Sequence, residues 1–184
     1  MHQDRTKWNN RYLASTKGAP TPPGFLKNNQ HLLRVGCVLD GAAALYLAHQ
    51  PCFNVTAIDI AEEGLKRLAV FAAAQGVEIA TQCIDLDDAQ QVSTLGVYDT
   101  IVISYFKPSA ALLQLLISRL CPGGSLLLTT YNLQHHQATG FPARFCLAPG
   151  ELKLLSDKLQ LIRYESETTD TGHFDGYLFS KLSG

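Results

Sequence analysis

Asn54-Val-Thr-Ala-Ile-Asp-Ile-Ala-Glu-Glu63 is the stretch that decides the fold of this chain. Residues 55–59 are an apolar, β-branched run that ends on an aspartate, and helix-forming residues follow at once. Residues 35–40 repeat this pattern, and an alanine-rich helical segment over 42–50 separates the two runs. Strand, helix, strand and terminal acid in this order are typical of the nucleotide-binding half of a doubly wound α/β sheet.

The rest of the chain continues this alternation of strand and helix patterns and then changes after residue 150. The pattern predicts an α/β protein with a Rossmann-like doubly wound sheet, mostly parallel, in which seven strands end in an antiparallel C-terminal hairpin. Turns are expected over 122–124 and loops over 131–145 and 166–173. The expected strands cover 35–39, 55–59, 77–84, 98–104, 125–130, 160–165 and 174–181, and the expected helices cover 1–12, 25–33, 42–49, 62–75, 110–120 and 151–159.

Length and composition fit one globular domain over residues 1–184, with an N-terminal helical arm (1–33) and a core (34–184). The net charge of -1, without a long run of either sign, gives no electrostatic footprint for nucleic acid or a membrane surface, so we expect neither as a partner. The five scattered cysteines lack CxxC spacing and the N-terminus is polar, which favours reduced thiols in a cytoplasmic protein. We expect a monomer or a homodimer.

Short motifs along almost the whole chain resemble the class I S-adenosylmethionine (SAM) dependent methyltransferases, and within them the small tellurite-resistance-type (TehB-like) branch. The order of these motifs carries the resemblance, because each of them is weak alone. They are Trp8-Asn-Asn-Arg-Tyr12, Val38-Leu-Asp40, Ala44-Leu-Tyr-Leu-Ala48, Val55-Thr-Ala-Ile-Asp-Ile60, Asp85-Leu86, Tyr98-Asp99, Leu120-Cys-Pro-Gly-Gly124 and Pro149-Gly-Glu-Leu152.

The resemblance implies that SAM lies across the carboxyl ends of the strands and that its methyl group passes to a small-molecule acceptor by in-line displacement. It implies that Asp59, with Ile60 beside it, holds the ribose hydroxyls. Asp85 and the backbone at Leu86 would meet the adenine amino group, and the stretch that begins at Ser104 would border the methionine end.

The N-terminal arm and the first turn supply the remaining expected contacts. Trp8 and Tyr12 are placed to form a lid, and Arg11 is placed to pair with the SAM carboxylate. Gly41 would be the remnant of a glycine-rich turn, which in the family reads LDxxxGxGRNALYLA. This chain reads Leu39-Asp-Gly-Ala-Ala-Ala-Leu-Tyr-Leu-Ala48, about five residues shorter, which leaves fewer backbone N–H groups for a carboxylate.

Several features have ordinary structural alternatives. Asp59 and Glu62 have the spacing of an N-capping box, Asp40 beside a helix start is commonly only favourable electrostatics, and Trp8 and Tyr12 can simply bury a helix face. Asp85 can equally belong to a solvated acidic turn over 85–88, and Arg11 can pair with any surface acid. His135-His136 with Cys146 lacks further ligands at metal spacing, so no metal is predicted.

No residue in the 131–145 loop, where we expect acceptor contacts, is marked as a general base. The catalytic residues are therefore not assigned. Two functions stay open: a SAM-dependent methyltransferase with a small-molecule acceptor, and a non-catalytic relative that has lost SAM binding and serves a binding or regulatory role. An NAD-binding enzyme is disfavoured by the poor glycine turn and the closing hairpin.

Overall fold

A computed structural model describes residues 2–16 and 18–183. In these residues seven strands form one sheet in the order β3-β2-β1-β4-β5-β7-β6. The first five strands in this order pair in parallel, and β7 pairs antiparallel with both β5 and β6. The strands are β1 (Gly36–Asp40), β2 (Phe53–Asp59), β3 (Ala80–Cys83), β4 (Tyr98–Ser104), β5 (Leu120–Tyr131), β6 (Leu159–Thr169) and β7 (Gly172–Lys181). The predicted fold class is confirmed.

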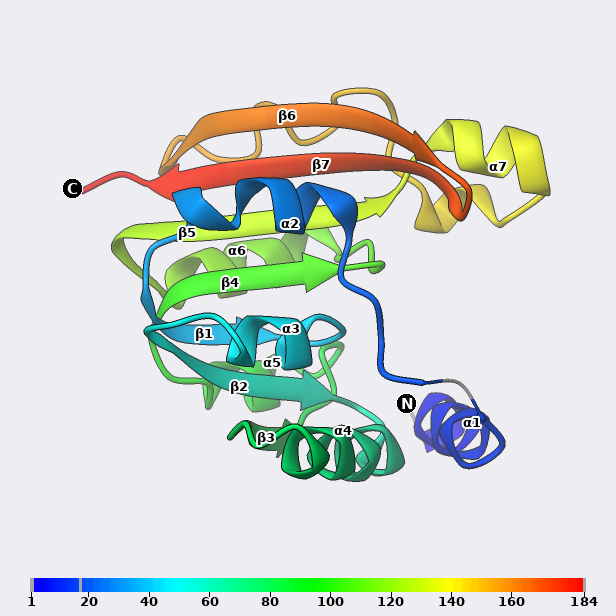
Figure 1. The fold of residues 1–184 in the computed structure, drawn as a ribbon. Coiled ribbons are helices and arrows are strands. Elements are labelled where there is room, and N and C mark those ends of the chain that lie inside the picture. The colour runs from blue at the N-terminus through cyan, green and yellow to red at the C-terminus, as the bar shows by residue number, and fades with distance from the viewer. Residues whose placement is uncertain (1, 17, 184) are drawn as a thin grey trace.

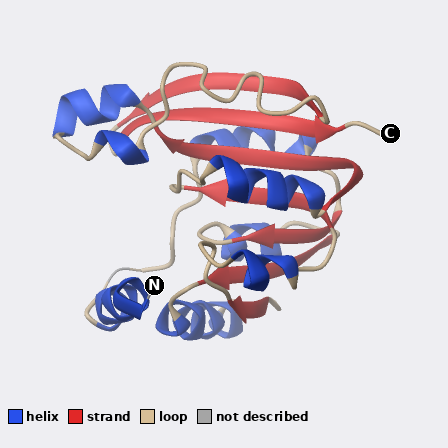
Figure 2. Cartoon of the chain, turned by 180° about the vertical axis from the view of Figure 1, so that it is seen from behind, coloured by secondary structure: helices blue, strands red, loops and turns tan. Residues whose placement is uncertain are grey.

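The described helices cover both faces of the sheet, so that the sheet is the middle layer of three (Figure 1). Figure 2, seen from behind, brings α5 and α6 to the front, whereas α2, α3 and α4 lie on the face toward the viewer in Figure 1. The helices are α1 (His2–Leu13), α2 (Gly24–Asn29), α3 (Ala44–Ala48), α4 (Glu62–Ala74), α5 (Ala89–Ser93), α6 (Ala110–Ser118) and α7 (Leu133–Thr139), with 3₁₀ turns at Gln30–Leu32 and Ala143–Phe145.

Strand alternation divides the core into two buried layers. Val38 and Val102 point to the face covered by α2 and α3, while their neighbours Leu39 and Ile101 point to the face covered by α5 and α6. Successive residues of a strand face opposite sides, so strands buried on both sides read as continuous apolar runs, as β1 and β4 do in the sequence. Among the described residues, none of the helices is both long and apolar enough to span a bilayer.

The structure corrects the sequence prediction most clearly after β5. The predicted helix over 151–159 is a series of turns, in which the N–H groups of Lys153 and Leu155 bond three residues back rather than four. The carboxylate of Glu151 accepts the Ala148 N–H at 2.7 Å and pairs with the Lys107 ammonium at 2.8 Å. Tertiary contacts therefore override good helix propensity. The predicted loop over 131–145 contains α7 and a 3₁₀ turn, and most of the predicted loop over 166–173 is strand.

Two further element boundaries differ from the prediction. The Pro-Gly-Gly sequence at 122–124 lies within β5 rather than in a turn before it. The third strand is four residues long instead of eight.

A glycine in the middle of β7 lets α2 approach the sheet closely. Gly176 pairs with Thr129 of β5, and a Cβ built on Gly176 would lie 2.4 Å from the ring of Phe25 in α2. Phe25 is 2% exposed, so its ring has little room to withdraw. The absence of a side chain at Gly176 is therefore a packing requirement of the arm.

We expect Gly176→Ala to lower the free energy of unfolding by about 1–3 kcal/mol through overpacking against Phe25. Chemical denaturation measures the change. Gly18→Ala is the matched control, since a Cβ at Gly18 meets no atom within 4 Å, and it should change stability by less than about 0.5 kcal/mol. Equal effects of the two substitutions would contradict the packing role of Gly176.

Candidate functional site

Polar side chains stand at the carboxyl ends of five adjacent parallel strands. Asp85 follows β3, Asp59 ends β2, Asp40 ends β1, Ser104 ends β4, and Thr129 lies near the end of β5. Parallel strands end at the same edge of a sheet, and ligands of open α/β sheets bind outside this edge where the strand order reverses. Here the order reverses between β1 and β4. The structure thus brings the predicted strand-end residues to one edge of the sheet.

Asp59 uses both carboxylate oxygens within the chain. Its Oδ1 accepts the Ala61 N–H at 2.8 Å, and its Oδ2 accepts the hydroxyl of Tyr12 at 2.9 Å. Burial raises the pKa of Asp59, and burial together with Asp59 raises the pKa of the Tyr12 phenol, which keeps Tyr12 a hydrogen-bond donor.

The capping-box alternative for Asp59 and Glu62 is wrong. The N-cap residue of α4 is Ala61, which makes no side-chain cap bond, and the N–H of Glu63 is instead accepted by Asn9 of α1 at 3.1 Å. A backbone N–H group in the first turn of α4 is therefore bound by a side chain of α1 rather than by Asp59, the acid that ends β2.

Helix α1 is held against α4 beside this acid, through a close contact with a glycine. The ring of Tyr12 packs over Gly64, where an added Cβ would lie 2.7 Å from a ring carbon. Arg67 of α4 donates hydrogen bonds to the backbone oxygens of Tyr12 and Ser15. A glycine inside a helix costs about 1 kcal/mol relative to alanine. Gly64 therefore weakens α4 locally but permits the contact that brings the Tyr12 hydroxyl to Asp59.

The other two arm residues predicted to contact the cofactor do not reach Asp59. The guanidinium of Arg11 lies 4.9 Å from the ring centroid of Trp8, and Trp8 is 37% exposed. The rings of Trp8 and Tyr12 are 6.4 Å apart between centroids. Of the lid residues predicted from the sequence, Tyr12 is the one that the structure joins directly to the strand-end acid.

Asp40 closes the shortened turn after β1. Its Oδ2 accepts the Ala43 N–H at 2.6 Å, while its Oδ1 has no hydrogen-bond partner among the described residues. The side chain is buried, and this burial raises its pKa to about 7. Gly41 has no steric need to be glycine, since a Cβ there would only touch the Ile58 oxygen at 3.5 Å. One of the few backbone N–H groups of the shortened turn, that of Ala43, is therefore already bound by Asp40 within the turn.

The raised pKa of Asp40 predicts that the protein loses stability as the pH rises. An acid whose pKa is higher in the folded state than its ordinary 3.8 binds more protons folded than unfolded, so stability falls between about pH 4 and pH 7. The full effect is on the order of 4 kcal/mol for a shift of about three units. Asp40→Asn should remove most of this slope while keeping an acceptor for the Ala43 N–H. Unfolding free energies of both proteins at several pH values measure it, and parallel slopes would contradict the assignment.

Asp85 and the two predicted backbone contacts lie in tight turns. Asp85 is 5% exposed, its carboxylate accepts the Asp87 N–H at 3.0 Å, and its own N–H is bound by Gln91. Leu86 is half-buried against the core. Ile60 is also half-buried, and its backbone oxygen accepts the Cys83 thiol at 3.5 Å. The turn at Asp85 is therefore ordered by its own side chain, which is buried rather than solvated.

Buried oxygens without partners and a strained residue mark the end of β4. Ser104 Oγ and Thr129 Oγ1 lack hydrogen-bond partners among the described residues. Tyr105 follows Ser104 with a φ of 60°, a left-handed conformation that is unfavourable for an aromatic residue. Its N–H is bound by the Thr129 oxygen at 2.8 Å and its hydroxyl donates to the Thr21 oxygen at 3.1 Å. The segment that joins α1 to α2 therefore crosses this end of the sheet.

The His-His-Cys group is separated in the structure. His135 is buried in α7 and stacks on Tyr131 at 4.1 Å, whereas the Nδ1 of His136 contacts the Phe141 oxygen. The Cys146 thiol faces the Pro142 oxygen at 3.9 Å. Over residues 2–16 and 18–183, no group of three or more histidine, cysteine or acidic side chains is arranged to hold a metal ion.

The close contact of α1 with the strand-end acid Asp59 was not predicted from the sequence. Gly64 was a usable signal, because it stands alone in a predicted helix of otherwise good helix formers, where an isolated glycine commonly marks close packing. The partner that needs this space, Tyr12, is 52 residues away, and nothing local to either residue predicts the pairing.

Solved structures that share this fold include S-adenosylmethionine-dependent methyltransferases, as the resemblance implied. The N-methyltransferase NodS from Bradyrhizobium japonicum WM9, solved in complex with S-adenosyl-L-homocysteine (SAH), matches with a TM-score of 0.69 at 18% identity over 96% of this chain and 98% of its own. TehB from Haemophilus influenzae has a TM-score of 0.69 at 17% identity, covering 97% of this chain and 67% of TehB.

A third structure, determined for the conversion of a disulfide bond into a thioacetal group during echinomycin biosynthesis, has a TM-score of 0.76 at 16% identity. That match covers 97% of this chain and 92% of the other chain. At such identities the likeness shows the fold. No protein-family model matches the chain, and no curated protein matches it.

Proposed function

We propose that this protein is a SAM-dependent methyltransferase that acts on a small-molecule acceptor. The observation that carries the proposal is Asp59, a carboxylate at the end of β2 beside the point where the strand order reverses. Such an acid is placed to accept both hydroxyls of a ribose. The same fold in NodS was solved with SAH.

Along the edge from β3 to β5, the side chains at the strand ends fit successive parts of SAM. Asp59 accepts the ribose hydroxyls, since a carboxylate has about four acceptor sites and only two are used within the chain. Asp85 lies on the β3 side, toward the adenine. The unpartnered oxygens of Asp40, Ser104 and Thr129 lie on the β1 to β5 side, where a cationic amino acid group needs acceptors. When bound, SAM supplies an electrophilic methyl group on a sulfonium.

The chain itself then has to bind and orient the two reactants and to exclude water from them. An in-line displacement at sulfur gains most from positioning of the two reactants, which can be worth several kcal/mol. The segment between α1 and α2 lies over the end of β4 through the Tyr105 to Thr21 hydrogen bond, which places it to shield the reacting end from water. Tyr12 holds Asp59 in place, and the incoming ribose must share or displace its hydroxyl.

A non-catalytic role is the second candidate, and two contacts favour it. Asp59 is already bound by Tyr12, and the N–H of Ala43 in the shortened turn is already bound by Asp40. Both contacts weaken the sites that would hold the ribose and the carboxylate of SAM. A protein that keeps the fold for stability or for partner binding would retain them.

SAH should raise the melting temperature if the enzyme proposal holds, because a ligand of the folded state stabilises it by about 2.7 kcal/mol at 100 times its Kd. Thermal denaturation at roughly millimolar SAH measures the shift. Asp59→Ala should abolish it, while Asp157→Ala, at an exposed acid far along the chain, should leave it unchanged. The absence of any shift with the unmodified protein would favour the non-catalytic role.

The substitution Tyr12→Phe tests whether the Tyr12 hydroxyl competes with the ribose for Asp59 or instead orients this carboxylate. If the hydroxyl competes with the ribose, its removal should tighten SAH binding by roughly tenfold or more, since a hydrogen bond to a charged group is worth about 1.5–3 kcal/mol. Calorimetric titration of both proteins with SAH gives the two Kd values. Weaker binding by Tyr12→Phe would mean that the hydroxyl orients Asp59 instead of opposing the ligand.

A further inference from the structure

Four aromatic rings beyond the end of β4 pack one against the next, and the ring of Phe174 packs against the first two of them. The ring centroids of Tyr105 and Tyr131 are 6.4 Å apart, those of Tyr131 and Phe141 are 5.0 Å apart, and those of Phe141 and Phe145 are 6.0 Å apart. Tyr105 is 39% exposed and Phe145 45% exposed, while the two middle rings are half-buried. These four rings, which come from three separate segments, are here called the aromatic row.

The row begins where the reacting end of the proposed cofactor would lie. Tyr105 directly follows Ser104, whose Oγ has no partner among the described residues. The φ of 60° at Tyr105 is a conformation that persists only when the surrounding structure enforces it, and such outliers gather at functional sites. The row therefore leads from the end of β4 outward over the 141–145 segment.

The row ends at a positive charge. The guanidinium of Arg144 lies 4.6 Å from the ring centroid of Phe145. Arg144 is exposed, and none of the ion pairs between described residues includes it. The nearby Glu151 carboxylate is neutralised by Lys107 at 2.8 Å. Arg144 thus offers a guanidinium that is free to pair with an anion.

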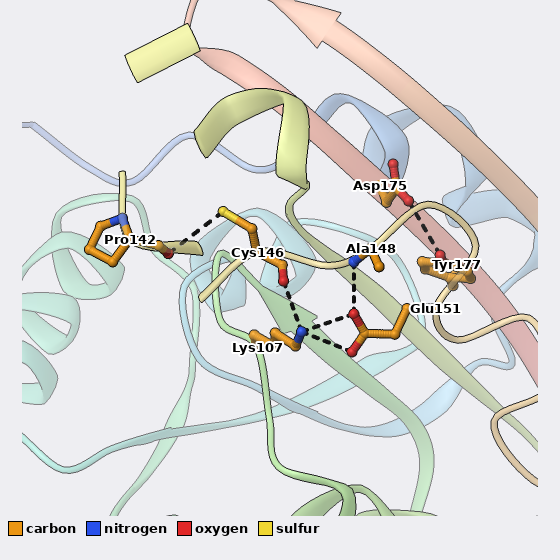
Figure 3. Close-up of polar contacts among 7 residues, drawn as sticks. All are labelled: Lys107, Pro142, Cys146, Ala148, Glu151, Asp175 and Tyr177. Carbon is orange, nitrogen blue, oxygen red and sulfur yellow. Dashed lines mark hydrogen bonds and ion pairs between the residues drawn. The ribbon is translucent and has the colours of Figure 1, made fainter. Parts of the chain in front are cut away.

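The support of the row is rigid. Lys107 donates to the Cys146 oxygen at 2.8 Å and binds Glu151, which in turn accepts the Ala148 N–H; Figure 3 shows these groups converging from the two segments. On the other side, Tyr131 stacks on His135 at 4.1 Å, and burial lowers the pKa of His135, which favours its neutral form. The rings are therefore held in place before a ligand arrives.

We propose that the aromatic row binds the methyl acceptor, and that this acceptor is a planar aromatic acid whose anionic group pairs with Arg144. The rest of the ligand then lies along the row in the direction of Tyr105. A flat ring gains from stacking on the aromatic side chains, and a carboxylate matches the planar guanidinium. This inference rests on the proposed function for the transfer step, whereas the binding of the aromatic acid can be measured without it.

Saturation-transfer NMR with three probes tests the chemistry. 2-Naphthoate is the planar acid, decahydronaphthalene-2-carboxylate keeps the charge without the aromatic face, and 2-naphthamide keeps the face without the charge. The unmodified protein should bind 2-naphthoate at least roughly tenfold more tightly than either analogue, because only this probe uses both the rings and Arg144. Equal binding of the three, or no binding of 2-naphthoate at millimolar concentration, overturns the proposal.

Arg144 and Phe145 are exposed, so we expect substitutions at these positions to leave the fold intact. Arg144→Ala should weaken 2-naphthoate roughly tenfold and leave 2-naphthamide unchanged, while Phe145→Leu should weaken both. The matched controls are Arg163→Ala, at an exposed arginine of β6, and Phe71→Leu, at another phenylalanine beneath an arginine, and neither should change binding. Unchanged binding in Arg144→Ala and Phe145→Leu overturns the proposal. Melting temperatures confirm folding.

SAH binding, measured on the same samples, separates this proposal from the proposed function. A protein that binds SAH but not 2-naphthoate overturns the acceptor site alone. A protein that binds 2-naphthoate through Arg144 but does not bind SAH supports the aromatic site and counts against methyl transfer.

Discussion

Parallel pairing of β3, β2, β1, β4 and β5 is the constraint on which the site depends. Parallel strands place all their carboxyl ends at one edge, and residues that are far apart in the sequence become neighbours there. The acids at the ends of β1 and β2 and the hydroxyls at the ends of β4 and β5 meet in this way. β7 runs antiparallel to β5 and brings its amino end to this edge, whereas β6, antiparallel to β7, ends there as the parallel strands do. These two strands extend the sheet and support the segments beside it.

At this edge, Asp59 and Asp40 differ in how many of their carboxylate oxygens are hydrogen-bonded within the chain. Asp59 has two internal partners, one of them a phenol delivered by a distant helix. Asp40 is more deeply buried and has one oxygen without a partner. An unsatisfied buried acceptor is costly, typically by 1–3 kcal/mol, and proteins retain such groups where a ligand or a catalytic need compensates. The β1 to β5 side is thus the part of the edge with the most unmet hydrogen-bonding capacity.

The sequence predicted the elements that short-range patterns control. The strands that end at Asp59 and Ser104 were predicted to the residue at their carboxyl ends, because an apolar run stops at a polar group. The segment over 151–159 was predicted to be a helix but forms turns, and the Lys107 to Glu151 ion pair ties it to a distant part of the chain that local propensity does not take into account. The Tyr12 contact with Asp59 was missed for the same reason. Contacts across long separations are set by packing, which single-residue propensities do not contain.

The position of β7 has a consequence for how the chain acquires its structure. β7 comes after β6 in the sequence but lies between β5 and β6, and its turn with β6 is very short. A hairpin with so short a turn closes within microseconds, whereas the pairing of β7 with β5 links residues about fifty positions apart. We therefore expect the two strands to form a ribbon that docks onto β5 as a unit. Until that moment the apolar edge of β5 stays open, which makes it the place where a nascent chain is most vulnerable to wrong pairing.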